Sequence, residues 1–299
     1  MQTTNKVFMV KPVNFGFNPQ TATDNAFQKR GYEEYSQENA LREFISYISL
    51  LKANKIEVIV AEDTPVPHTP DSIFPNNWFT THSDGTLVIY PMSAPNRRNE
   101  RKKCFIDTIL KNFEVKRVVD LSWWESEDMF LEGTGSLILD RNNKIAYAGI
   151  SPRTSETVLE DFCKKMGYTP ITFHSYDRNG VLIYHTNVMM SLGEEYAVIC
   201  LESITDEQER NRVYDSLVRT GKKIVPITHS QVENFAGNMI GLKGGDGKDI
   251  LVMSASARKS LTPEQATELG RMNRILSPQL DFIEMNGGGS ARCMIAEIF

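Results

Sequence analysis

Five polar residues recur at nearly constant spacing along the chain, and together they could carry out nucleophilic catalysis. They are Asn77, Glu132, His185, Asn238 and Cys293, and successive members are separated by 55, 53, 53 and 55 residues. A cysteine thiolate is a nucleophile, a histidine can move protons to and from a reacting group, and a carboxylate can orient that histidine. Residues so far apart in sequence meet only if each belongs to a repeated unit and the units surround a common axis.

The cysteine follows the most unusual stretch of the sequence, the glycine run Gly287–Gly289. Glycine has no Cβ, so such a run allows the backbone to pass close to a ligand. Cys104, Cys163 and Cys200 have no comparable context, and we expect them to be ordinary free thiols. No cysteine and histidine stand at the spacing of metal ligands, so no metal site is expected. No cofactor is implied either, since the thiol would do the chemistry.

Helical and extended patterns alternate along the whole chain. Apolar residues at helical spacing predict five helices, over 36–53, 99–113, 154–166, 205–220 and 262–276. Thr205 with Gln208 has the spacing of a capping box, and Pro263 suits the first position of a helix. Short apolar strands are predicted after the helices, over 56–61, 115–121, 169–173, 222–227 and 279–285.

Hairpin patterns complete the repeat. They are predicted over 78–91, 135–149, 187–201 and 238–253, and a fifth pair would join 291–299 to 6–13. The order of elements therefore predicts an α/β fold of about five ββαβ units, forming a single domain over residues 1–299. In each unit one of the five polar residues stands just before the hairpin.

These residues resemble the motifs of the guanidino-group-modifying enzymes, the amidinotransferase and arginine deiminase superfamily. The terminal Gly287-Gly-Gly-Ser-Ala-Arg-Cys293, the pair Glu132-Gly133 and His185 carry the resemblance, which covers essentially the whole chain. It implies the five-bladed α/β propeller of that superfamily, the pentein fold. The local sequence around Asn77, Glu132 and His185 is most similar to that of the citrulline-utilisation hydrolases.

The resemblance also implies roles for individual residues. Cys293 would attack the substrate carbon, His185 would transfer protons, and Glu132 would orient His185. The substrate-binding residues would be Asp71, Asn77, Asn187, Arg153 and Arg97, and Arg153 would hold the carboxylate of an amino acid. A surface salt bridge at a helix start is the alternative for Arg153.

Departures from the arginine deiminase pattern bear on the substrate. Asn77 and Asn187 stand where those enzymes carry aspartates, and an amide suits a neutral ureido group better than a buried guanidinium. We therefore expect a cysteine-dependent hydrolase of C–N bonds that converts citrulline to ornithine, CO2 and ammonia. Asp71 and Glu132 could still hold a cation, which keeps arginine deiminase, dimethylargininase-like and succinylarginine dihydrolase-like activities open.

Two further alternatives belong to other classes. An amidinotransferase would pass its covalent intermediate to an amine, and this outcome stays open on the residues alone. A ribosome-binding initiation factor shares the ring fold without catalysis, but cysteine, histidine and glutamate in phase argue against a pure binding role.

Composition limits the partners. The chain of 299 residues has 40% hydrophobic residues and a net charge of −5, which argues against a nucleic-acid surface. No signal peptide and no membrane-spanning stretch is recognised in the sequence, so we expect a cytoplasmic protein. A small amino acid is the expected substrate, and a homodimer is compatible with these features.

Overall fold

Five three-stranded sheets, all built alike, form the framework of the computed structural model, which describes residues 1–25, 27–29 and 36–299. In each sheet the middle strand pairs antiparallel with one neighbour and parallel with the other. The sheets are β15(Ala296–Ile298)-β1(Lys6–Lys11)-β2(Glu57–Glu62), β3(Phe79–Thr81)-β4(Thr86–Ile89)-β5(Arg117–Asp120), β6(Leu137–Asp140)-β7(Ile145–Gly149)-β8(Thr169–Phe173), β9(Met190–Leu192)-β10(Tyr196–Ile199)-β11(Lys223–Pro226) and β12(Ile240–Lys243)-β13(Asp249–Val252)-β14(Arg274–Leu276).

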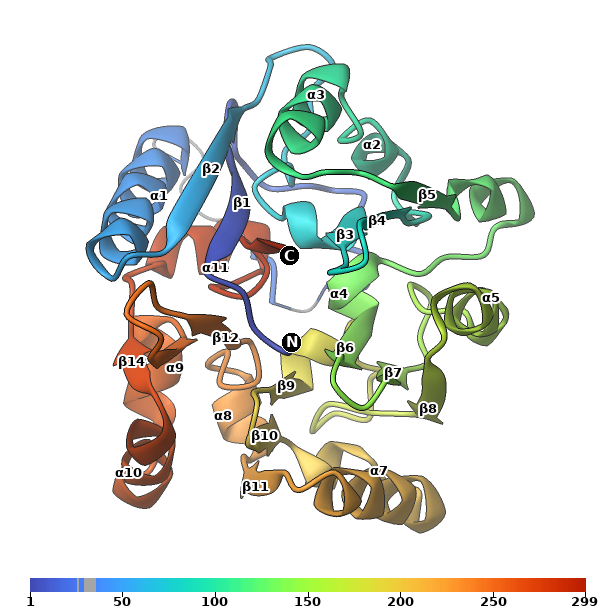
Figure 1. Cartoon of the computed structure of the whole chain (residues 1–299), viewed down its shortest axis with the longest axis vertical. Coiled ribbons are helices and arrows are strands. Elements are labelled where there is room, and N and C mark those ends of the chain that lie inside the picture. Colours follow the sequence, from blue (N-terminus) through green and yellow to red (C-terminus); the bar gives the residue numbers. More distant parts are fainter. Residues whose placement is uncertain (26, 30–35) are drawn as a thin grey trace.

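The sheets follow one another around the middle of the molecule in sequence order (Figure 1). Their antiparallel edge strands face the middle, and one long helix per unit lies at the periphery. The outer helices are α1(Ser36–Ala53), α3(Lys103–Asn112), α5(Glu156–Met166), α7(Glu207–Arg219) and α10(Pro263–Met272). The predicted α/β class and the five repeated units are therefore confirmed, and both chain ends contribute to one sheet as expected.

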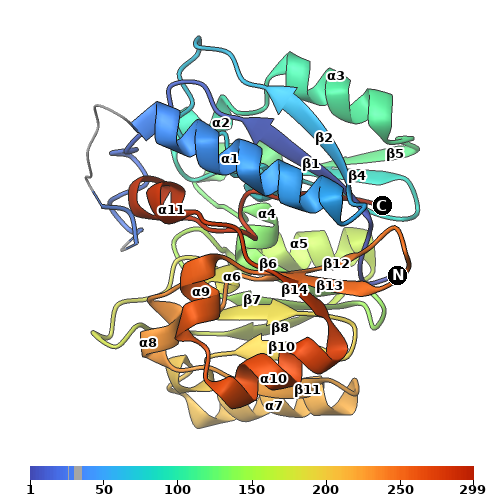
Figure 2. The same ribbon diagram turned by 90° about the vertical axis from the view of Figure 1, so that its left-hand side faces the viewer.

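Shorter helices fill the connections. Some of them lie on the loops that lead into the edge strands, and others follow the parallel strands (Figure 2). They are η2(Pro75–Asn77), α2(Pro95–Arg98), η3(Ser122–Glu127), α4(Gly133–Ser136), α6(Thr186–Met189), η4(Leu201–Ser203), α8(His229–Val232), α9(Ala255–Ser260) and α11(Asp281–Gly287).

Local sequence signals explain several helix boundaries. Helix α5 ends at Gly167, which adopts the left-handed conformation with φ 69° that glycine tolerates best. Helix α10 begins with a capping box, in which the Thr262 hydroxyl accepts from the Gln265 N–H and the Gln265 side chain accepts from the Thr262 N–H. Helix α1 has the predicted bounds.

The predicted capping box of α7 was wrong. Asp206, not Thr205, caps this helix, and its carboxylate accepts from the Glu209 N–H at 2.8 Å. An aspartate is at least as good an N-cap as threonine, and its negative charge favours the helix N-terminus.

The predictions for the last unit were also wrong in part. Helix α10 ends at Met272 rather than at 276, because β14 over Arg274–Leu276 pairs parallel with β13. The strand predicted over 279–285 is instead mostly helix α11, and its N-cap residue Leu280 and Ile283 within it are both buried in the core. A strand of three residues is too short to give a periodic signal.

Apolar faces of the outer helices pack on the sheets. Phe44, Tyr47 and Leu51 of α1 are completely buried against Val7 and Met9 of β1. Burying each such side chain contributes about 1.5–3 kcal/mol, which holds the helix on its sheet. Among the residues that the structure describes, no helix combines the length and apolar character needed to cross a bilayer.

Candidate active site

The five in-phase residues meet at the inner ends of their units. Glu132 is the N-cap residue of α4, and His185 is the N-cap residue of α6. Each of these side chains is therefore positioned by the start of a short helix. His185 Nε2 lies 2.8 Å from Glu132 Oε2. Asn77 Nδ2 donates to the Glu132 carbonyl oxygen at 3.4 Å. Neighbouring units are thus joined through their functional residues.

Cys293 lies in the turn that precedes β15, and its side chain is 8% exposed. Its Sγ accepts from Asn238 Nδ2 at 3.1 Å and from Asn187 Nδ2 at 3.6 Å. Asn238 also holds the turn itself, because its Oδ1 accepts from the Arg292 N–H at 3.0 Å. Two side-chain amides therefore direct their N–H groups at this one sulfur.

Glu132 is a completely buried carboxylate that remains ionised. Burial alone would raise its pKa, but Arg153 at 3.6 Å, the bond with His185 and the nearby Arg97 together lower the pKa to about 2. Its Oε1 accepts from the Ser93 N–H at 2.9 Å. Glu132 therefore has fixed partners on both oxygens and serves to hold the imidazole in place.

The charge state of Glu132 fixes the tautomer of His185. An ionised carboxylate only accepts hydrogen bonds, so Nε2 must carry the hydrogen and Nδ1 keeps the lone pair. Burial lowers the pKa of His185 below its ordinary value, against the opposing effects of Glu132. The imidazole is consequently neutral at pH 7 and able to take a proton on Nδ1.

Glycines clear the space around this imidazole. A Cβ on Gly135 would collide with Asn77 Nδ2 and lie 2.8 Å from His185 Nδ1. A Cβ on Gly133, which has φ 46°, would collide with the Asn76 carbonyl oxygen. The sequence Glu132-Gly-Thr-Gly135 is therefore dictated by close packing next to the histidine.

The glycine run before Cys293 has protein neighbours. Cβ atoms on Gly287 and Gly289 would lie 2.8 Å and 2.7 Å from the Phe74 ring, and one on Gly288 would lie 2.6 Å from Asn25 Nδ2. Gly288 also ends helix α11 with φ 63°. Close packing against Phe74 and Asn25 therefore leaves no room for a Cβ at these three positions.

Arg97 organises one side of the site. Its guanidinium, 3% exposed, donates to Glu100, to Asn77 Oδ1 at 2.8 Å and to the Phe74 carbonyl oxygen at 3.1 Å. Asp71 Oδ2 lies 4.0 Å from Arg97 Nε, whereas Asp71 Oδ1 is buried without a hydrogen-bond partner. Burial raises the pKa of Glu100 to about 7, although Arg97 opposes that rise.

Arg153 lies on the other side and is not at the surface. Its guanidinium forms an ion pair with the Asp24 carboxylate, in which Nε donates to Asp24 Oδ2 at 2.9 Å. Nη2 also donates to the Thr21 carbonyl oxygen at 3.0 Å. The guanidinium also lies 4.7 Å from the centroid of the Tyr184 ring. The exposed salt bridge considered as an alternative is therefore wrong, because Arg153 is 3% exposed.

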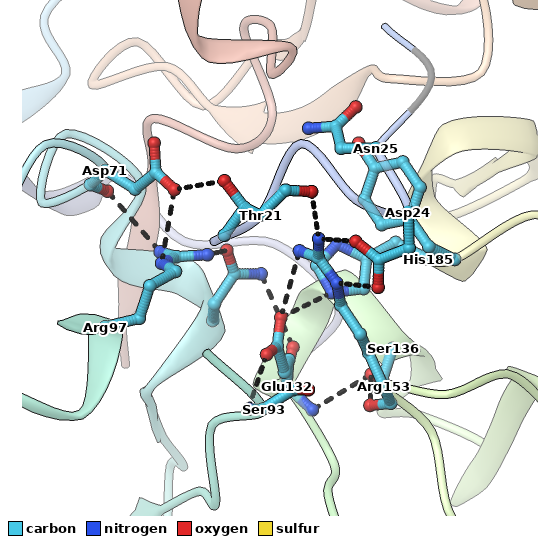
Figure 3. A network of polar contacts seen from close by, with 12 residues as sticks. Thr21, Asp24, Asn25, Asp71, Ser93, Arg97, Glu132, Ser136, Arg153 and His185 are labelled. Atoms are coloured by element: carbon cyan, nitrogen blue, oxygen red, sulfur yellow. Dashed lines mark hydrogen bonds and ion pairs between the residues drawn. The ribbon is translucent and has the colours of Figure 1, made fainter. Parts of the chain in front are cut away.

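The segment 18–29 covers these groups, as far as it is described. Figure 3 shows Asp24 and Thr21 on Arg153, and Thr21 together with Arg97 on Asp71. Asn18 Nδ2 donates to Asp71 Oδ2 at 2.7 Å. No pattern in the sequence pointed to Asp24 or Thr21, since they lie outside the repeated units. Asn238 was in phase but had no expected role.

A family model described as "N,N dimethylarginine dimethylhydrolase, eukaryotic" matches residues 11–299. Comparison with curated protein sequences gave no significant match.

Solved structures share the fold at low sequence identity. The N-terminal domain of ArgZ, an arginine dihydrolase of Cyanobacteria, was solved as a cysteine-to-serine variant bound to substrate. It has a TM-score of 0.77 and 18% identity, covering 98% of this chain and 97% of that domain. A cysteine-to-alanine variant of AgrE with L-arginine has a TM-score of 0.77 and 18% identity, with 98% of this chain but 40% of AgrE covered. A Pseudomonas aeruginosa dimethylarginine dimethylhydrolase variant with citrulline has a TM-score of 0.67, 14% identity and full coverage of both chains.

Proposed function

Because the chain belongs to the N,N-dimethylarginine dimethylhydrolase family, a pentein family of hydrolases that act on C–N bonds of arginine-related substrates, we propose that it is an arginine dihydrolase. Arginine and water would give citrulline and ammonia in a first step. Citrulline and a second water would then give ornithine, CO2 and ammonia. The second step is the citrulline hydrolysis that the sequence motifs favour.

The observation that carries the proposal is a pair of buried acceptors, Asp71 Oδ1 and Asn187 Oδ1, that have no hydrogen-bond partner among the described residues. A buried oxygen without a donor costs about 1–3 kcal/mol, and the N–H groups of a guanidino or ureido substrate would supply those donors. Asn187 stands beside the thiol, since its Nδ2 lies 3.6 Å from Cys293 Sγ.

Charge in the site supports a cation for the first step. In the described part of the chain, the carboxylates of Asp24, Asp71, Glu100 and Glu132 form ion pairs with two arginines, Arg97 and Arg153. When the substrate carboxylate replaces that of Asp24 on Arg153, negative charge still exceeds positive charge even with Glu100 protonated, and the guanidinium of the substrate would balance it. The ureido product is neutral, and the amides of Asn77 and Asn187 suit its carbonyl and N–H groups.

In the proposed mechanism Cys293 is the nucleophile and His185 transfers protons. Cys293 loses its proton to His185 Nδ1, and the thiolate forms a bond to the guanidino carbon. That carbon then expels ammonia, which leaves with the proton from His185. Water next gives a proton to His185, its oxygen bonds to the same carbon, and the C–S bond breaks to release citrulline.

The same groups serve the ureido step. The thiolate adds to the ureido carbon, and the ornithine amine leaves with a proton from His185. Hydrolysis of the resulting thiocarbamate releases carbamate, which decomposes to CO2 and ammonia. Arg153 would hold the carboxylate of the amino acid once Asp24 moves away, and Arg97 would position Asn77 and Asp71.

Substrate turnover tests the proposal. The wild-type protein and Cys293→Ala are incubated separately with arginine, citrulline, dimethylarginine and succinylarginine, and ammonia, ornithine and citrulline are quantified. We expect two ammonia and one ornithine per arginine, and no turnover by the variant. If citrulline accumulates without ornithine, the protein catalyses only the first step and is an arginine deiminase. Turnover by Cys293→Ala would overturn the mechanism.

Dimethylarginine hydrolysis is the second candidate, and the family match favours it. It would release dimethylamine instead of the first ammonia. A kcat/KM for dimethylarginine above that for arginine would establish this candidate over arginine dihydrolysis.

A further inference from the structure

A cysteine, a glutamate and a histidine come together in the fourth sheet unit, apart from the catalytic residues. Cys200 follows β10 directly, Glu202 lies in the turn η4 after it, and His229 begins helix α8. Strands β10 and β11 are parallel neighbours, so the segments that follow them leave the sheet at the same edge. This explains how residues 29 positions apart in sequence become neighbours.

The donor atoms of these three residues all lie within 4.8 Å of one another. Cys200 Sγ lies 4.0 Å from Glu202 Oε1, and the same oxygen accepts from the His229 N–H. Tetrahedral Zn²⁺, with bonds of about 2.0–2.3 Å, holds its donors about 3.5 Å apart. The group must contract by about 1 Å, and rotation of the exposed Glu202 and the half-buried His229 allows this while the buried Cys200 stays fixed.

Access and charge also suit an ion. His229 lines a cavity of about 610 Å³ that opens between α8 and the loop around Val181, so a hydrated ion can reach the imidazole. Within the described part of the chain, no lysine or arginine forms an ion pair with Glu202. Its negative charge therefore remains available to the ion.

We propose that Cys200, Glu202 and His229 form a binding site for a divalent transition-metal ion of the zinc class, with water as the fourth ligand. Thiolate, imidazole and carboxylate are the donors that Zn²⁺ takes in proteins, and magnesium or calcium would not select a thiolate. The sequence alone indicated no metal site, because the fold, not the spacing, joins these residues.

Metal titration tests the site. The test uses full-length Cys293→Ala protein, so that the catalytic thiol cannot bind the ion, after treatment with a chelator. Co²⁺ is titrated and the sulfur-to-cobalt charge-transfer absorption is recorded, and Zn²⁺ affinity is measured by calorimetry. The same measurements are made after adding Cys200→Ala or His229→Ala, and after adding Cys163→Ala as the matched buried-cysteine control.

We expect one equivalent of metal and a charge-transfer band in the Cys293→Ala protein and in its Cys163→Ala derivative. Cys200→Ala should abolish the band, and His229→Ala should weaken Zn²⁺ binding at least about tenfold, since even outer partners of metal ligands reach that factor. His229 is only half-buried, so its replacement tests the site even if the buried Cys200 variant does not fold. Absence of the band in the Cys293→Ala protein, or equal affinity after His229→Ala, would overturn the proposal.

Discussion

His185 is kept neutral, in one tautomer and in one orientation by its environment. Burial keeps the pKa of the imidazole low, while the bond to Glu132 and the charge of Glu132 oppose that effect. The base must be neutral to act, so activity is lost as pH falls through the pKa of His185. The acid limb of the pH profile is therefore expected below pH 6.5, the ordinary pKa of histidine.

Replacing Glu132 by glutamine should move that limb. Glu132→Gln removes the two interactions that raise the pKa of His185, so the acid limb shifts to lower pH. We also expect kcat to fall about 10²-fold or more, because the imidazole loses its orienting partner. The pH dependence of kcat/KM checks this. Ser93→Ala is the control, since Ser93 contacts Glu132 only through its backbone N–H; an unchanged or raised limb in Glu132→Gln would contradict the assignment.

Asp24 forms an ion pair with Arg153, the residue that is proposed to bind the substrate carboxylate. Asp24→Ala removes this competitor, so we expect KM for arginine to fall about threefold to tenfold, the effect of roughly 1 kcal/mol of ion pairing. Agmatine, which is arginine without its carboxylate, should show no gain. Thr23→Ala, a change on the same segment, serves as the control, and a higher KM for arginine in Asp24→Ala would show that Asp24 instead helps to bind it.

The contact between Glu132 and His185 was the most predictable part of the site, because the in-phase spacing of these two residues can be read along the sequence itself. The measured contacts join Glu132 to His185 and place two asparagines on Cys293. Asp24 could not be predicted, since it lies outside the repeat. The proposed metal-binding group at Cys200 could not be predicted either, because it depends on two parallel strands that end at one edge of their sheet.

At the scale of elements, short helices position the side chains of Glu132 and His185. Helices α4 and α6 have four residues each and begin directly after Glu132 and His185. Long amphipathic helices such as α1 were predicted well because many residues share their period. The three-residue strand β14 and helix α11 were not, because pairing with β13 and packing of Leu280 and Ile283 decide them.

Gly135 allows α4 to pack against His185. Replacing Gly135 by alanine, which adds one methyl group, tests this packing. Gly135→Ala would place a Cβ 2.8 Å from His185 Nδ1, so the ring must move. We expect kcat to fall at least about 10²-fold, as displacements near 1 Å do, with the circular dichroism spectrum preserved. Gly149→Ala, whose Cβ would lie 3.3 Å from Ser175 Oγ, is the control. Full activity in Gly135→Ala would show that the imidazole does not need this position.

At the scale of the molecule, both ends of the chain belong to one sheet, in which β1 lies between β15 and β2. Lys243 at the end of β12 donates its N–H to the Thr4 carbonyl oxygen at 2.9 Å, which links the fifth sheet to the start of the chain. We propose that the five units close into a propeller and that residues 1–299 act as one catalytic domain.

An ion-pair network ties the terminal strand to the rest. Glu297 of β15 lies 3.0 Å from Arg292 Nη2 and 3.6 Å from Arg141 Nη2, and both arginines are largely buried. Glu297→Gln leaves two buried cations without their carboxylate, so we expect a loss of about 3–5 kcal/mol in the free energy of unfolding. Denaturant titration measures it. Glu57→Gln, which removes an exposed pair with Lys6 in the same sheet, should cost less than about 1 kcal/mol. Equal costs would refute the structural role of the network.

The central claim is that Cys293 carries the guanidino carbon through a covalent bond. The most direct test mixes the protein with arginine, quenches the mixture in acid within milliseconds to seconds, and measures the intact mass and the digested peptides. We predict a transient adduct with the mass of arginine less ammonia on the peptide that contains Cys293, absent in Cys293→Ala. Turnover of arginine with no adduct at any quench time, or an adduct on another residue, would contradict the claim.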